Sequence, residues 1–159
     1  MIVPEHLVTF IGAAEVAVWI ANCDNQSRPD IARPTGVVKG EADDELIIFL
    51  PQRNAETILT NIEHNDRLAL FGSRVTTFES YQFKGRCVMQ RLANDEEVNY
   101  QRRLIAAFAD CLSEIFSLPA AKVIDAYYSR PIIALTLRVE EIFDQTPRKG
   151  TGNRISQEG

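Results

Sequence analysis

The spacing of apolar residues changes along the chain, and each change predicts a different element. Runs rich in β-branched and aromatic residues, bounded by Gly, Pro, Asn or Asp, are typical of strands. Such runs occupy residues 14–21, 29–39, 45–51, 68–71 and 81–92. Pro34 and Gly36 interrupt the second run, which is tolerated at an edge, at a bulge or where a ligand lies close to the backbone. The acidic turn 40–44 then predicts a hairpin between residues 29–39 and 45–51.

Helical spacing appears in three places. Ile58, Leu59 and Ile62 predict a short helix over 55–64, with Asn54 as its N-cap. A longer stripe follows the acidic residues 95–97, which favour a helix N-terminus. Its apolar members are Leu104, Ile105, Phe108, Leu112, Ile115 and Phe116. Pro119 is expected to end this helix and open another that runs to about residue 128.

The last regular pattern follows Pro131. Apolar residues at 133, 135, 137 and 139 alternate with Ala, Thr, Arg and Glu, which predicts a strand with one buried face. Strands with one inserted helix, then helices, then a final strand indicate an α+β barrel. We therefore expect one domain over 1–143, because 159 residues that are 45% hydrophobic suit a single core. The glycine-rich, basic segment 144–159 is expected to be a flexible tail.

Composition narrows the class of partner and the compartment. The net charge of −5 gives no general attraction for nucleic acid or anionic lipid. Cys23, Cys87 and Cys111 have neither zinc-site nor disulfide spacing, which favours a reducing cytoplasm and no metal site. No apolar run approaches the roughly 20 residues of a membrane span. The sequence therefore predicts a cytoplasmic protein that binds neither membrane nor nucleic acid.

One corner of the predicted barrel is a candidate anion site. The apolar run 46–50 ends at Pro51, and Arg53 and Asn54 follow immediately. A guanidinium and the amides at the start of a helix are donors that a phosphate uses. The alternative is that Arg53 is an ordinary solvated loop arginine, as most surface arginines are.

Three segments resemble the FMN-binding split-barrel family related to pyridoxamine 5'-phosphate oxidase, in its branch of predicted flavin-nucleotide-binding proteins. They are residues 29–36, residues 50–62 and residues 76–85. The resemblance spans roughly 16–92 and resumes over 138–152. It implies a mostly antiparallel split β-barrel with flanking helices. It also implies a homodimer that holds FMN in a cleft between its subunits.

The same resemblance implies which residues meet the cofactor. Arg33 would lie on a cofactor-facing strand, Arg53 and Asn54 would meet the phosphate, and Gln82 would bond to the ring or its side chain. The oxidase has an Arg-Lys pair where this chain has Arg53-Asn54, and its glutamine falls at the position of Ser80. The full predicted cofactor set is Arg33, Thr35, Leu50, Arg53, Asn54, Ser80, Gln82 and Lys84.

The function implied by the resemblance is that of an FMN-dependent oxidoreductase with an unknown substrate or electron acceptor. Gln82 or Lys84 would place a donor or a positive charge near the ring, whereas a solvent-facing Lys84 is the simpler alternative. No catalytic residue can be named. A non-catalytic flavin carrier or sensor is the competing function, and a barrel that has lost FMN is a third.

Overall fold

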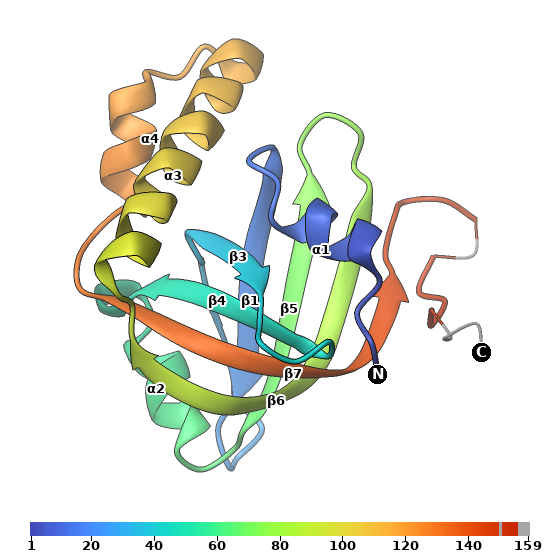
Figure 1. Cartoon of the computed structure of the whole chain (residues 1–159). Coiled ribbons are helices and arrows are strands. Elements are labelled where there is room, and N and C mark those ends of the chain that lie inside the picture. Colours follow the sequence, from blue (N-terminus) through green and yellow to red (C-terminus); the bar gives the residue numbers. More distant parts are fainter. Residues whose placement is uncertain (150, 156–159) are drawn as a thin grey trace.

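The computed structural model describes residues 1–149 and 151–155, which fold as α+β (Figure 1). The strands are β1 (Val16–Cys23), β2 (Pro29–Ala32), β3 (Gly36–Lys39), β4 (Glu45–Pro51), β5 (Arg67–Arg74), β6 (Ser80–Leu92) and β7 (Ile132–Asp144). The helices are α1 (Glu5–Ile11), α2 (Glu56–Ile62), α3 (Asp95–Phe116) and α4 (Ala120–Tyr127), with a 3-10 turn at Gln52–Asn54. The strands form one antiparallel sheet in the order β2-β1-β5-β6-β7-β4-β3.

The sheet curls around a core because its two longest strands bend. β6 and β7 pair along most of their length, with register shifts at Lys84/Gly85 and at Cys87/Met89. Such bulges bend a strand and increase its twist. Figure 1 shows β6 passing from beside β5 to run beneath β7 and β4, so the two halves of the sheet cross. The main core fills the interior, and fully buried side chains such as Ile20, Leu50 and Phe83 line it.

The predicted run 29–39 is two strands rather than one. β2 pairs with β1, where Ala32 lies opposite Ile20, and β3 pairs with β4, where Gly36 lies opposite Phe49. The hairpin prediction is therefore confirmed for β3 and β4 and is wrong for the first half of the run. Arg33, Pro34 and Thr35 form the link that carries the chain from one end of the sheet order to the other.

Two further predictions about elements were wrong in detail, and one helix was missed. The N-cap of α2 is Ala55 without a side-chain cap bond, because Asn54 belongs to the preceding 3-10 turn. α1 was not predicted, although Leu7, Phe10 and Ile11 have helical spacing and are buried. β7 has more than one buried face near its start, since α3 residues pack over Ala134.

The long helix α3 and its partner α4 stand against one side of the barrel (Figure 1). α3 begins with a complete capping box, in which the Asn94 side chain accepts from the Glu97 amide at 2.9 Å and Glu97 accepts from the Asn94 amide at 2.8 Å. Phe108 of its apolar stripe and Val123 of α4 pack with Ala17 of β1 in one buried cluster. The helix pair thus covers the β1 side of the outer sheet surface.

The described part of the C-terminal segment returns along β7. The Ile155 amide donates to the Ile142 carbonyl at 2.8 Å, and Arg154 pairs with Glu141 at 3.2 Å. Ile155 also packs against the main core. These contacts hold residues 151–155 to the barrel, and the flexibility expected for 144–159 stays a prediction, with 150 and 156–159 outside the described residues. No helix within the described ranges is long and apolar enough to cross a membrane.

Candidate functional site

The outer surface of β1, β5, β6 and β7 carries two parallel rows of side chains. Residues directly opposite one another in antiparallel strands share a face of the sheet. The first row is Trp19, Phe71, Gln82 and Phe143, and the second is Ala21, Ala69, Lys84 and Glu141. We call this surface the outer face. Most of its side chains are apolar, and the helix pair covers only the end near Ala17.

Two depressions open on the outer face. The aromatic depression is lined by Trp19, Ala21, Ile31, Ala69, Phe71 and Gln82, and has a volume of about 330 Å³. The lysine depression is lined by Ala21, Cys23, Arg67, Ala69, Lys84 and Glu141, and also has a volume of about 330 Å³. The two depressions share Ala21 and Ala69, whose small side chains leave space above the sheet. A volume of this size is within the range of small-molecule sites.

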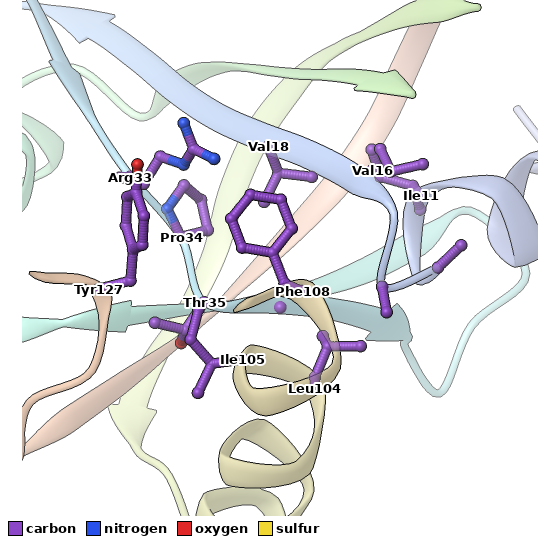
Figure 2. A pocket seen from close by; sticks show the side chains of 13 residues that line it. Ile11, Val16, Val18, Arg33, Pro34, Thr35, Leu104, Ile105, Phe108 and Tyr127 are labelled. Carbon is purple, nitrogen blue, oxygen red and sulfur yellow. The ribbon is translucent and has the colours of Figure 1, made fainter. Parts of the chain in front are cut away.

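Arg33 contacts Trp19, one of the residues that line the aromatic depression. Its guanidinium carbon is 4.4 Å from the centre of the Trp19 ring, 4.7 Å from Tyr127 and 5.5 Å from Phe108. Figure 2 shows the guanidinium beside the Tyr127 ring. Burial lowers the pKa of Arg33 from its ordinary value, with Tyr127 opposing the shift. Desolvating a cation is costly unless a partner compensates it, and aromatic faces supply part of that compensation.

The partners of Arg33 within the described ranges are aromatic rings, with no carboxylate in an ion pair. Eight other arginines do form ion pairs with Asp or Glu. The crevice below Arg33, which Val18, Thr35 and Phe108 line, is only about 30 Å³ (Figure 2). That space suits a water molecule or two, not a ligand. The crevice itself is therefore too small for an anion that pairs with Arg33.

Arg53 reaches the same helix as Arg33. Its Nη2 donates to the carbonyl oxygen of Asp125 at 3.2 Å, two residues before Tyr127 on α4. Like Arg33, it has no carboxylate ion pair within the described part of the chain. A cation near the last turn of a helix is stabilised by the carbonyl dipoles, which explains the contact without a ligand. The two guanidiniums nevertheless both lie against the last turns of α4.

Like Arg33 and Arg53, the predicted residues Leu50, Thr35 and Asn54 line neither depression. Leu50 is fully buried in the main core. Thr35 is also buried, and its Oγ1 donates to Oε1 of Gln101 on α3 at 2.6 Å, which ties the β2–β3 link to that helix. Asn54 is exposed on the 3-10 turn beside Arg53. Thr35 and Asn54 thus adjoin the two arginines, whereas the Leu50 side chain faces the interior.

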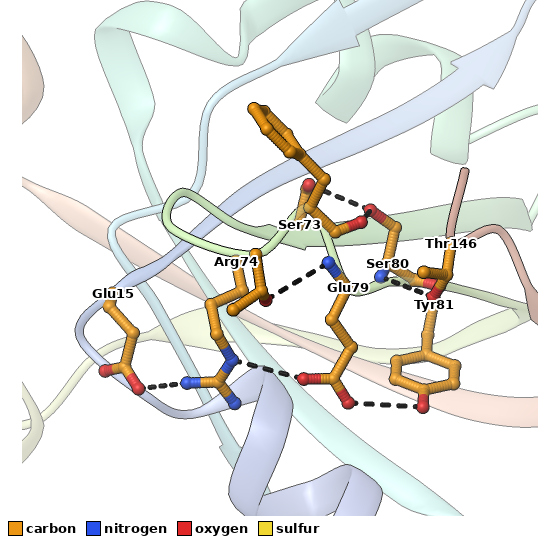
Figure 3. A network of polar contacts seen from close by, with 9 residues as sticks. Glu15, Ser73, Arg74, Glu79, Ser80, Tyr81 and Thr146 are labelled. Atoms are coloured by element: carbon orange, nitrogen blue, oxygen red, sulfur yellow. Dashed lines mark hydrogen bonds and ion pairs between the residues drawn. The ribbon is translucent and has the colours of Figure 1, made fainter. Parts of the chain in front are cut away.

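Ser80 stands at the start of β6, where a polar network holds the turn from β5 (Figure 3). Its Oγ is 2.8 Å from the Ser73 hydroxyl and 2.7 Å from the Phe78 carbonyl. Arg74 in the same turn contacts Glu15 and donates to Glu79 at 3.2 Å. The Ser80 hydroxyl is therefore satisfied within the protein. The resemblance offered Ser80 and Gln82 as alternatives for the family's glutamine, and of these two Gln82 lines the aromatic depression.

The structure places Gln82 in the aromatic depression, Lys84 in the lysine depression, and Arg33 in the neighbouring crevice, against Trp19. Sequence reasoning missed the aromatic residues that line the depression or contact Arg33, because they come from distant elements. Trp19 is on β1, Phe71 on β5, and Tyr127 on α4. Period-two spacing of Trp19 with Ala21, and of Ala69 with Phe71, was the signal that could have indicated a common face. Among the described residues, no cluster of His, Cys, Asp and Glu is arranged to hold a metal ion.

Comparison with known proteins gives the fold its class. No protein-family model and no curated protein matches the chain. Among solved structures, HupZ from Group A Streptococcus is 15% identical and covers 97% of this chain and 99% of its own, with a TM-score of 0.57. A provisionally assigned pyridoxamine 5'-phosphate oxidase from Lactobacillus delbrueckii is 14% identical over 89% and 93%, with a TM-score of 0.53. An FMN-binding protein from Syntrophomonas wolfei is 11% identical over 85% and 80%, with a TM-score of 0.51.

These matches identify the fold of this chain. It is the FMN-binding split barrel found in proteins similar to pyridoxamine 5'-phosphate oxidase. The α+β fold class and the predicted resemblance are confirmed. At identities this low the likeness extends to the fold, and function must be argued from the site itself.

Proposed function

We propose that this protein binds FMN on the outer face, with the ring in the aromatic depression and the phosphate toward Arg33 and Arg53. The observation that carries the proposal is Arg33, a half-buried cation whose partners within the described ranges are aromatic rings rather than a carboxylate. A phosphate would supply the missing negative charge. Charge-assisted bonds between arginine and phosphate are among the stronger polar contacts in proteins.

The aromatic depression fits a flat aromatic ligand. Trp19 and Phe71, whose ring centres are 5.8 Å apart, give one side an apolar surface, and the Gln82 amide adds a donor and an acceptor. Asn54, beside Arg53, would add a neutral donor where the oxidase has a lysine. Ligand binding by this arrangement requires no catalytic side chain. The protein's part is to orient the ring and to exclude water from it.

Bound FMN would supply electron transfer, and we propose an oxidoreductase as the activity. The competing role, a flavin carrier or sensor, uses the same site without turnover. The two are separated by adding a nicotinamide reductant under anaerobic conditions and then an electron acceptor. An enzyme bleaches the flavin absorbance and restores it over repeated cycles. A carrier keeps an oxidised spectrum.

Uptake of FMN by the purified protein is the direct test of the site. We expect saturable binding at micromolar concentrations. Quenching of flavin fluorescence measures it, because Trp19 and Phe71 would contact the ring. Riboflavin is the matched control ligand, since it has the same ring without the phosphate. It should bind at least tenfold more weakly if arginines hold the phosphate. Equal affinity for the two ligands would contradict the assignment of Arg33 and Arg53.

We also propose that a second copy of the chain covers the outer face. Ile31 is 62% exposed there, next to Phe71 and the two alanines of the depressions. An apolar surface around a ligand site is typical of an interface. A dimer that closes over this face would shield the ring from solvent on the side that the barrel leaves open.

Ile31→Glu is expected to shift the protein from dimer to monomer. Each subunit of a two-fold dimer contributes the same surface, so the carboxylate enters the interface twice. Burying it without a partner should weaken association by roughly 100-fold or more. Sedimentation velocity across a concentration series measures the change. Leu92→Glu is the control, because Leu92 is 64% exposed at the far end of β6. Equal sedimentation of the two variants would refute the interface.

A further inference from the structure

The lysine depression has a charge that its neighbours do not neutralise. Lys84 lies directly opposite Glu141 across β6 and β7, a position where opposite charges commonly pair. Glu141 instead pairs with Arg154, at 3.2 Å. The Lys84 ammonium lies 4.7 Å from the centre of the Phe143 ring, and no described carboxylate forms an ion pair with it.

The other charged group at this depression is already paired. Arg67 contacts Glu140, which also accepts from Arg86 at 3.2 Å, and Arg86 in turn bonds to Asp66. Lys84 is therefore the unpaired charge among the residues that line the hollow. Its apolar floor comes from Ala21 and Ala69. A positive group above an apolar floor selects a ligand with a negative group and an apolar body.

We propose that the lysine depression binds a small organic anion, a carboxylate with a flat apolar body, alongside the flavin. The two depressions share Ala21 and Ala69, so molecules in them would lie edge to edge on one surface. The resemblance placed Lys84 at the cofactor, whereas its side chain lines the hollow beside the aromatic one. This inference rests on the proposed function, because the anion would be the substrate or electron acceptor that meets the flavin ring.

Benzoate is a suitable probe because it combines one carboxylate with a flat ring. Titration into ¹⁵N-labelled full-length protein should give saturable shifts of the Ala21, Ala69 and Gly85 amides, in the millimolar range or tighter. Lys84→Met should weaken benzoate binding at least tenfold, because a hydrogen bond to a charged group is lost. Lys84 is exposed, so this variant is expected to fold. Lys84→Arg should retain most of the affinity.

Matched controls separate this site from the flavin site. Lys122→Met, on exposed α4 surface, should leave benzoate binding unchanged, and benzylamine, with the opposite charge, should not bind. Saturating FMN should leave benzoate affinity within about twofold, because adjacent sites do not compete. Competition between the two, or equal binding by wild type and Lys84→Met, would overturn the inference. If FMN fails to bind while Lys84-dependent benzoate binding persists, the proposed function falls and the anion site stands.

Discussion

Arg33→Met is expected to weaken FMN binding by about 10-fold to 100-fold while leaving the protein as stable as before. The loss follows from removing a charge-assisted bond to phosphate, worth roughly 1.5 to 3 kcal/mol. Stability should change little, because no described carboxylate would lose its partner when the cation is removed. Methionine can also keep contact with the Trp19 and Tyr127 rings. Flavin titration and urea unfolding of the unliganded protein measure the two quantities.

The two measurements together distinguish an arginine that binds phosphate from one that stabilises the fold. A structural arginine would show the reverse pattern, with lost stability and unchanged affinity for FMN. Arg102→Met provides the control, since Arg102 is exposed on α3 and outside both depressions. It should alter neither quantity. Riboflavin affinity should also be similar in wild type and Arg33→Met, because riboflavin has no phosphate for the arginine to contact.

The barrel itself was predictable because its strands carry local signals. Alternation or apolar runs marked the central strands, and the stripe behind residues 95–97 marked α3. The prediction failed where local signals conflict with tertiary packing. Residues 29–39 read as one interrupted strand, yet the break at Arg33 and Pro34 is where the chain leaves β1 and crosses to β4. Alternation likewise implied one buried face for β7, and α3 covers the other near Ala134.

The candidate site was only partly predictable for a related reason. The resemblance supplied Arg33 and Arg53, and it supplied Gln82 as the glutamine two positions from where the oxidase has its own. Which rings surround Arg33 depends on the packing of α3 and α4 against β1, and no spacing in the sequence encodes that contact. Lys84 and Glu141 are 57 positions apart, and their failure to pair depends on Arg154 folding back from beyond β7. An unpaired charge such as that of Lys84 indicates a ligand site only when the partners of the surrounding charges are known.

Gly85→Ala is expected to destabilise the protein by about 3 to 5 kcal/mol, among the largest effects of a single substitution. A Cβ at this position would lie 1.9 Å from the Arg138 carbonyl oxygen and 2.8 Å from its carbonyl carbon. Because both are backbone atoms of β7, they cannot move aside as a side chain does. The strands would have to separate at the register shift between Lys84 and Gly85. Urea unfolding followed by circular dichroism measures the loss.

Gly36→Ala on β3 is the matched control. Its Cβ would meet Leu104 Cδ2 at 2.8 Å, the end of a side chain that can rotate away, so the expected cost is below about 2 kcal/mol. Equal urea midpoints for the two variants would contradict the close strand approach at Gly85. Where Gly85→Ala still folds, Gln82 and Lys84 should be displaced together, since both precede the glycine on β6. Loss of both FMN and benzoate binding in that variant would mean that the bulge at Gly85 aligns the two depressions.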